Sequence, residues 1–262
     1  SSVTSGDYNT ALGSNAGLSI TTGGSNVAIG YLAGDTMTDT SNTVLIGVNA
    51  GQAINSSDAN YAIGIGKDAL QDLTSGQGTT AIGYRALADV TTGDYNTAFG
   101  YAAGDGMTTG LSNTLMGWGA GGASGFNAGG YNVMLGAEAG GSAIAPFSNV
   151  YIGYRSGGQN KQGGYNVMIG DAAGYNPVGN QYSGSHNVFM GYAAGYNTGA
   201  DKNVFIGSSA GQYTTGSFNT FMGYQAGKGG TTSAPYSSGE KNVAVGYGAL
   251  TAFTTGFQNV AI

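Results

Sequence analysis

Few residues of this 262-residue chain could take part in catalysis. It contains no Cys and a single His, His186, which excludes thiolate nucleophiles and any site that needs two histidines within one chain. The 13 acidic residues are scattered, and the best carboxylate pair is Asp35 with Asp39, in one loop. Two carboxylates across a sugar could hydrolyse a glycosidic bond, but two solvated loop acids are the simpler interpretation. We therefore predict no enzymatic activity, no metal site and no cofactor.

A glycine-rich hexapeptide, from Gly117 to Gly122, matches the dinucleotide-binding pattern GxGxxG. Because 52 of the 262 residues are Gly, such a match is expected by chance. The functional form of this motif opens a helix after a strand, whereas this copy lies inside a repeat with no helical pattern behind it. We therefore discount it as a cofactor site.

Aromatic residues are better candidates for ligand binding. Trp118 directly follows a recurring Gly, and Tyr takes the same place in seven other copies: Tyr31, Tyr84, Tyr101, Tyr154, Tyr192, Tyr224 and Tyr247. A stacked aromatic row could bind sugar rings. The alternative is that each ring packs over a corner of the chain and leaves its hydroxyl in water.

Two long insertions, within 170–191 and 223–246, contain a second group of candidates. Insertions in repeat proteins collect on one surface, and loops often carry function. Their planar aromatic and hydrogen-bonding groups suit a carbohydrate, so we predict that ligand contacts concentrate there, at Tyr175, Asn176, Tyr182, Tyr236 and Ser237. The alternative is that these 262 residues act only as a spacer.

The element that must position these residues is an internal repeat. Its unit reads Gly-x-x-Asn-[Thr/Val]-x-[Ile/Leu/Met/Phe]-Gly-x-x-Ala-Gly, as in Asn26–Gly34 and Asn96–Gly104. The second Gly of this unit, here called the closing Gly, recurs 14 times, and 17 residues is the commonest interval. A fifteenth copy begins at Asn259, so we expect a single repetitive segment over 1–262, part of a longer fibre. We also expect extra residues inside the motif at Asn42–Gly47 and Asn60–Gly66.

Three slots of the repeat have nearly invariant residues. Gly at fixed positions indicates backbone with positive φ or a close approach of two chain segments. The slot three residues after the closing Gly is Ala, with Ser156 the exception, which predicts a crowded seam. Asn starts the motif, with Thr79 the exception, and stacked Asn side chains can hydrogen-bond along the repeat axis.

The repeat predicts an all-β fold. Its β-branched and aromatic residues favour strands, and its Gly density excludes helices. Short strands gain stability by stacking on their neighbours. We therefore predict a left-handed parallel β-roll, or β-solenoid, of about 15 coils with a repeat of about 17 residues, each coil having two short strands and two turns.

Both faces of the predicted strand are apolar. Val27 and Ile29 point one way, and Ala28 points the other way with Asn26; in later copies the place of Ala28 is taken by large residues such as Phe205. One face can fill the coil, and the other needs a cover. The economical cover is two further copies of the chain, which predicts a homotrimer, and Phe205→Asp is expected to cause dissociation or insolubility. The alternative is a monomer that covers this face with its own loops.

Composition narrows the possible partners. The net charge is −6 with no basic run, so nucleic acid is excluded as a partner. No apolar stretch approaches the ~20 residues of a membrane helix, so no membrane insertion is expected.

The repeats resemble two families of fibrous proteins. Asn-Val-Ala-Ile-Gly with Ala three residues later is similar to the head repeats of trimeric autotransporter adhesins, which are left-handed parallel β-rolls. The longer unit, Asn-Thr-Ala-Phe-Gly-Tyr-x-Ala-Gly with Thr91-Thr92-Gly93 before it, resembles phage tail-fibre proteins over essentially the whole chain. This resemblance implies a structural fibre of a virion that takes part in attachment to a host cell-surface glycan or protein receptor.

Three other functions are compatible with a repetitive β-fold of this kind. A bacterial trimeric surface adhesin would use the same architecture at the cell surface. An ice-binding solenoid would need Thr-x-Thr ranks on a flat face, whereas the Thr pairs here are adjacent and lie in turns. A polysaccharide-degrading spike would need the carboxylate pair discussed above.

Overall fold

Each copy of the repeat folds into one turn of a parallel β-solenoid in the computed structural model of the chain, which describes residues 6–122, 128–177, 183–230 and 237–262. The predicted all-β class and the repeat of about 17 residues are confirmed. The chain forms two units, Ser1–Tyr131 (unit 1) and Asn132–Ile262 (unit 2). The described part of the chain has no helix long and apolar enough to cross a membrane.

Each coil contributes one short strand. Unit 1 holds β1 (Thr10–Leu12), β2 (Val27–Ile29), β3 (Val44–Ile46), β4 (Ile63–Ile65), β5 (Thr80–Ile82), β6 (Thr97–Phe99) and β7 (Thr114–Met116). Unit 2 holds β8 (Val133–Leu135), β9 (Val150–Ile152), β10 (Val167–Ile169), β11 (Val188–Met190), β12 (Val204–Ile206), β13 (Thr220–Met222), β14 (Val243–Val245) and β15 (Val260–Ala261). The short 3₁₀ helix η1 (Ser57–Ala59) lies between β3 and β4.

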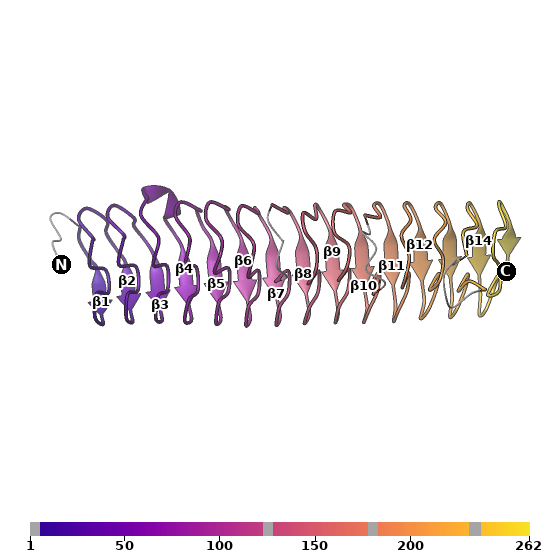
Figure 1. The fold of residues 1–262 in the computed structure, drawn as a ribbon, viewed down its shortest axis with the longest axis horizontal. Coiled ribbons are helices and arrows are strands. Elements are labelled where there is room, and N and C mark those ends of the chain that lie inside the picture. Colours follow the sequence, from indigo (N-terminus) through magenta and orange to yellow (C-terminus); the bar gives the residue numbers. More distant parts are fainter. Residues whose placement is uncertain (1–5, 123–127, 178–182, 231–236) are drawn as a thin grey trace. The chain divides into compact units, whose positions relative to one another are not determined.

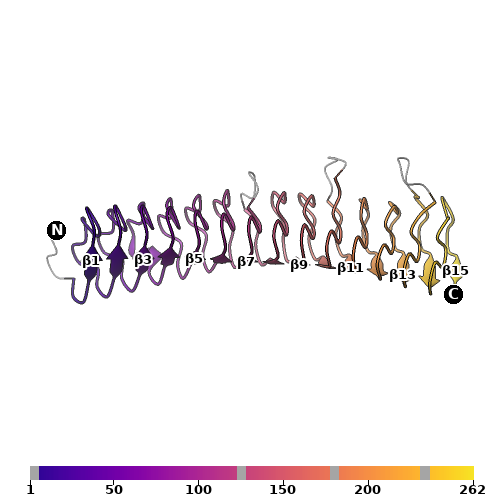
Figure 2. The same ribbon diagram turned by 90° about the horizontal axis from the view of Figure 1, so that it is seen from below.

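Successive strands pair in parallel and in register. In unit 1 each strand pairs with the next, so that Val27 of β2 lies between Thr10 of β1 and Val44 of β3. The same pattern joins the strands of unit 2, where Phe205 of β12 lies between Phe189 and Phe221. Within each unit the arrows point the same way (Figure 1) and the strands lie along one side of the coils (Figure 2). Each coil thus contacts only its neighbours in sequence, as expected of a solenoid.

The prediction of two strands per coil was wrong. The described residues form one three-residue strand in almost every coil, and the opposite side is built from turns with three isolated parallel bridges, such as Leu111 with Gly130. Hydrogen bonds between coils continue there, for example from the Thr21 N–H to the Thr38 carbonyl at 3.0 Å. After each strand the extended backbone is interrupted by residues with positive φ, such as Leu32 and Gly34.

The closing Gly is required by both its φ and its surroundings. Gly136 has a φ of 134°, and a Cβ built on it would lie 2.6 Å from the carbonyl oxygen of Gly153, the closing Gly of the next coil. Gly153 has the same relation to Gly170. Stacked closing glycines therefore let the backbones of adjacent coils meet without side chains between them.

The predicted Asn ladder is present. The Oδ1 atom of Asn132 accepts hydrogen bonds from the backbone N–H and the Nδ2 of Asn149, at 3.0 and 3.1 Å, and Asn149 does the same for Asn166. These side chains are at most 1% exposed. The ladder satisfies these buried amides, which would otherwise cost free energy, although the Nδ2 of the ladder residue Asn203 is buried without a hydrogen-bond partner in the structure.

The ladder is shorter than predicted in unit 1. The register pairs Val44 with Val27 and with Ile63, which places Thr43 and Ala62, rather than Asn42 and Asn60, at the ladder position. The inserted residues therefore precede the motif and do not interrupt it. Thr43 still donates its backbone N–H and its hydroxyl to Asn26 Oδ1, at 3.0 and 2.8 Å.

The structure decides which strand face is internal. The middle residue of almost every strand is buried while its two neighbours are partly exposed, as in β2 and β12. Phe205 is fully buried inside the coil and stacks on Phe189 and Phe221 with 5.0 Å between ring centroids on each side. The expectation that Phe205→Asp would separate chains therefore needs correction, because its charge would enter the interior of the coil.

Three slots share the interior volume. They are the strand centre, the turn slot four residues after the closing Gly, and the corner slot seven residues after it. In most coils of unit 1 small strand centres face large corner residues, as in the pairs Ala28 with Met37, Gly64 with Leu73, Ala81 with Val90 and Ala98 with Met107, whereas in the coil of β3 both Leu45 and Ile54 are large and buried. In unit 2 the sizes are reversed, in the pairs Met134 with Ala143, Tyr151 with Asn160, Phe189 with Thr198 and Phe205 with Thr214. All of these residues are buried, so the pairs keep the interior filled at the density that folded proteins need.

The turn slot follows the same rule. It is Gly where a large strand centre needs room, because a Cβ on Gly195 would lie 2.6 Å from the Phe189 ring. Where the strand centre is Gly64 or Ala81, this slot holds Leu70 or Leu87, both fully buried. The identity of one slot therefore depends on the others in the same coil.

Candidate functional site

The outer face of the sheet has a distinct chemical character, because it is apolar and partly exposed. It consists of the first and third residues of each strand together with the residue before the ladder position and the residue after the closing Gly. In the coil of β6 these are Tyr95, Thr97, Phe99 and Tyr101, and the three aromatic side chains are 59%, 53% and 55% exposed. The surface continues in unit 1 at Ile29, Ile46, Ile65, Met116 and Trp118 and recurs in unit 2 at Val188, Met190, Tyr192, Phe218, Met222 and Tyr224.

Trp118 lies on this outer face, directly after β7 and its closing Gly117. Its side chain is 53% exposed. Tyrosines in the same slot contact one another where they are adjacent, as Tyr84 and Tyr101 do at 5.0 Å between ring centroids. The predicted aromatic row is therefore half-exposed, so it presents ring faces and also packs on itself.

Tyr175 belongs to a compact group in unit 2, here called the Arg155 cluster (Glu138, Tyr154, Arg155, Tyr175 and Tyr196). The guanidinium of Arg155 lies over the Tyr154 ring at 4.9 Å and over the Tyr175 ring at 5.9 Å. Arg155 Nε donates to Glu138 Oε2 at 2.5 Å, and this pairing raises the pKa of Arg155. The Tyr175 and Tyr196 rings are 5.8 Å apart. Flat rings beside a charged, planar group provide stacking and hydrogen-bonding surface for a ligand.

The other predicted loop residues are less accessible or lie outside the described residues. Asn176 is 8% exposed and Ser237 is 1% exposed. The Ser237 hydroxyl donates to the Phe253 carbonyl at 2.7 Å and accepts from the Gly230 N–H, so it serves the fold. Tyr182 and Tyr236 lie outside the described residues.

The acidic pair proposed for hydrolysis has two unlike environments. Asp35 is half-buried, and burial raises the pKa of its carboxyl group. Asp39 is exposed, and its Oδ1 accepts a long hydrogen bond of 3.4 Å from the Thr38 hydroxyl. No group of three or more His, Cys, Asp or Glu that could hold a metal ion occurs among the described residues.

His186 and the glycine-rich hexapeptide have backbone roles. His186 takes the left-handed conformation, with a φ of 61°, immediately before Asn187, and stacks on Tyr165 at 5.0 Å between ring centroids. Gly117 closes β7, and Gly119 and Gly121 have positive φ in the following turn. The hexapeptide therefore forms a turn of the solenoid.

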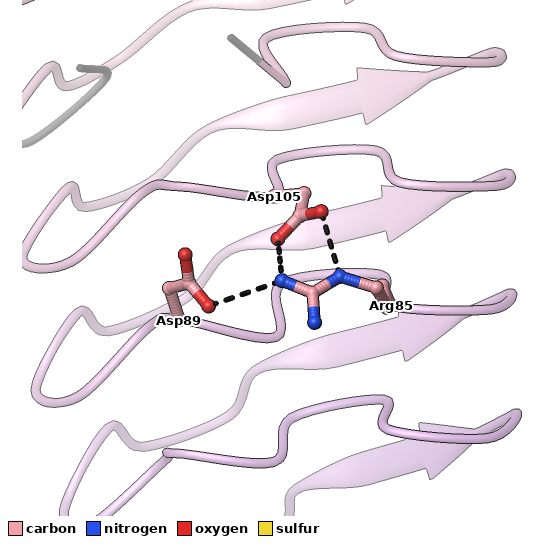
Figure 3. Close-up of polar contacts among 3 residues, drawn as sticks. All are labelled: Arg85, Asp89 and Asp105. Atoms are coloured by element: carbon pink, nitrogen blue, oxygen red, sulfur yellow. Dashed lines mark hydrogen bonds and ion pairs between the residues drawn. The ribbon is translucent and has the colours of Figure 1, made fainter. Parts of the chain in front are cut away.

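Charged residues bridge adjacent coils in a way that the sequence analysis missed. Arg85 binds Asp105 through two hydrogen bonds of 2.9 Å, and its Nη2 lies 3.5 Å from Asp89 (Figure 3). Arg85 and Arg155 both stand two residues after a closing Gly. In unit 2 the partner, Glu138, lies 17 residues earlier, at the same place of the preceding coil. Opposite charges at matching places of neighbouring coils were the signal that could have revealed the Arg155 pair, whereas Asp105 stands five residues after its closing Gly and does not match the place of Arg85.

No protein-family model and no curated protein matches this chain. The resemblance to fibre repeats therefore depends on the residues of the motif itself.

Proposed function

We propose that this chain is a self-associating structural segment of a fibre, folded as a left-handed roll and assembled as a homotrimer. The observation that carries the proposal is the outer face, which is apolar and partly exposed in both units although the interior of each coil is already filled. A large exposed apolar surface on a soluble protein favours association. Cyclic symmetry lets three copies cover this face for one another without leaving an open surface that continues to polymerise.

The role that fits this assembly best is the shaft of a viral tail fibre that takes part in host attachment. The motif resemblance supports this role. The separation between residues that pack the coil and residues that remain exposed supports it as well. Residues of the ladder, the interior and the closing Gly are committed to packing, while the Arg155 cluster and Trp118 are available for a glycan or protein receptor on the host. Three copies would multiply weak contacts through avidity. The location would be the virion; the alternative is a bacterial trimeric adhesin at the cell surface.

The test of self-association uses charged substitutions on the outer face. We expect the wild-type chain to sediment as a trimer, and Met190→Lys with Met222→Lys to shift it to a monomer that keeps its β-type circular dichroism, because two charges per chain would be buried at the interface. Ser238→Lys, an exposed position away from the strands, is the matched control and should leave the trimer intact. A folded wild-type chain that sediments as a monomer would contradict the proposal.

A further inference from the structure

We propose that unit 1 carries a binding site for a neutral sugar, in a polar hollow lined by Asp58, Ser75, Gln77, Thr92 and Asp94. The volume of the hollow is about 330 Å³, near the lower end of the range of ~300–1,000 Å³ for small-molecule sites. The inference rests on the attachment part of the proposed function, for which it names a ligand class. The five lining residues lie outside the outer face defined above. Tyr95, which borders the hollow, belongs to that face, so a sugar can use its ring only where the proposed trimer leaves it uncovered.

Three consecutive coils build the hollow. Asp58 comes from η1, while Ser75 and Gln77 precede β5 and Thr92 and Asp94 precede β6. Asp58 and Thr92 are exposed, and the other three side chains are half-buried. Carboxylate, amide and hydroxyl groups therefore converge on one small surface, which is the set of donors and acceptors that sugar hydroxyls need.

Two contacts fix the polar groups before any ligand arrives. Asp94 Oδ1 accepts the Gln77 backbone N–H at 2.8 Å, which leaves the second carboxylate oxygen for a ligand hydroxyl. The Tyr95 hydroxyl donates to Gln77 Oε1 at 2.6 Å, so the Gln77 amide presents its nitrogen as a donor. Preorganised groups lose little conformational entropy on binding.

An aromatic surface borders the hollow. Tyr95 is 59% exposed, and its ring lies against Gly78, where a Cβ would come within 3.1 Å of the ring. Tyr61 has the corresponding place in the coil of β4 and is 58% exposed. The apolar face of a pyranose can stack on such a ring while its hydroxyl groups reach the carboxylates, whose charge strengthens the hydrogen bonds.

The charge of the hollow selects among sugars. Asp58 and Asp94 supply two carboxylates, the described residues that line the hollow include no Arg or Lys, and the whole chain carries a net charge of −6. Sialylated, sulfated or phosphorylated glycans would meet like charge there, so the site should discriminate against them.

The test uses the full chain and soluble probes, the methyl glycosides of galactose, glucose, mannose and N-acetylglucosamine, followed by saturation-transfer NMR and titration. We expect at least one of these neutral probes to bind, and 3′-sialyllactose to bind more weakly. Asp58→Asn and Tyr95→Ala should each weaken binding about tenfold. Tyr165→Ala is the matched control, because Tyr165 has the same slot in unit 2 and is also 59% exposed. It should leave the affinity unchanged.

Three results would overturn the proposal. They are no saturation transfer to any neutral probe, an equal loss of affinity in the Tyr165→Ala control, and loss of wild-type binding on addition of EDTA, which would show that the carboxylates hold a cation. A monomeric chain would still present this hollow, since all its residues come from one chain. Failure of the self-association test and failure of this one are therefore distinguishable.

Discussion

In unit 1 most coils are filled from the corner and the turn, whereas in unit 2 most are filled from the strand. The coil of β6 has Ala98 at its strand centre and Met107 at its corner, while the coil of β12 has Phe205 and Thr214 in the same places. Both arrangements bury one large side chain in a cross-section of similar size. The comparison teaches that a large side chain can fill the interior from either place, although the coil of β3 buries both Leu45 and Ile54.

The two arrangements differ in their polar groups. Corner residues of unit 2 include hydroxyls and an amide that hydrogen-bond inside the coil. Thr214 Oγ1 donates to the Gly227 carbonyl at 2.9 Å, and Asn160 Nδ2 donates to the Tyr151 hydroxyl at 3.0 Å. Burial raises the pKa of Tyr151 well above its usual range. Unit 2 therefore combines an aromatic stack with hydrogen-bonded polar residues at its corners, whereas the corners of β2, β4, β5 and β6 in unit 1 are apolar.

The largest expected effect comes from Phe205→Asp in unit 2. An unpaired charge inside the stack of Phe189, Phe205 and Phe221 should cost more than about 4 kcal/mol and unfold unit 2. Chemical denaturation followed by circular dichroism measures this cost. Phe205→Leu, which keeps an apolar side chain, should lose only about 1–2 kcal/mol. A Phe205→Asp chain that melts like the wild type but separates into monomers would place Phe205 at a chain interface instead.

The volume rule is tested by moving the unit 2 arrangement into unit 1. Ala98→Phe alone should overpack the coil of β6 and cost about 1–3 kcal/mol. Met107→Thr alone should leave a cavity and cost about 2–4 kcal/mol. The double variant reproduces the pair Phe189 and Thr198, so its loss of unfolding free energy should be clearly smaller than the sum of the single losses. Additive losses in this double-mutant cycle would refute shared interior volume.

Much of this fold could be predicted because the repeat exposes its own constraints. Closing glycines, the Ala seam and the Asn ladder recur at fixed positions, and each has one physical explanation. The sequence could not predict which strand face is internal. Val27 and Ala28 are both apolar, so the alternation of side chains along the strand fits either face. The corner slot was not predicted because Met107 and Thr214 are residues of different types. Only the geometry of the coil shows that they occupy the same place in the interior.

Register and sites were harder to predict for different reasons. Asn42 and Thr43 are adjacent and both suit a strand start, so only the pairing with Val27 resolves the ladder position. Tyr175 was predicted from its place in a long insertion, but its partner Arg155 and the Glu138 carboxylate that binds Arg155 lie in two earlier coils. Contacts between coils depend on aligning insertions of unequal length, which a single sequence does not supply.

The smallest expected effect concerns the ion pairs of Arg85 in unit 1 and of Arg155 in unit 2. In unit 1 Arg85 is bound by Asp105 and approached by Asp89, whereas in unit 2 Arg155 has Glu138 as its carboxylate partner. Burial and the neighbouring charge of Asp105 raise the pKa of Asp89 above its ordinary value of 3.8. The folded state therefore binds a proton that the unfolded state has lost, and Asp89 destabilises the chain as the pH rises above about 4.

Asp89→Asn should consequently raise the stability of unit 1 slightly at neutral pH, by less than about 1 kcal/mol because the side chain is 43% exposed and its contact with Arg85 is long. The gain should vanish below pH 4, where the wild-type carboxyl is protonated as well. Thermal melting at pH 3.5 and pH 7 measures the difference. Glu138→Gln in unit 2 is the comparison, and it should destabilise at neutral pH because it removes the carboxylate that pairs with Arg155. If both substitutions destabilise equally at pH 7, then Asp89 stabilises the chain as a partner of Arg85, and the ion pairs of the two units do not differ in this respect.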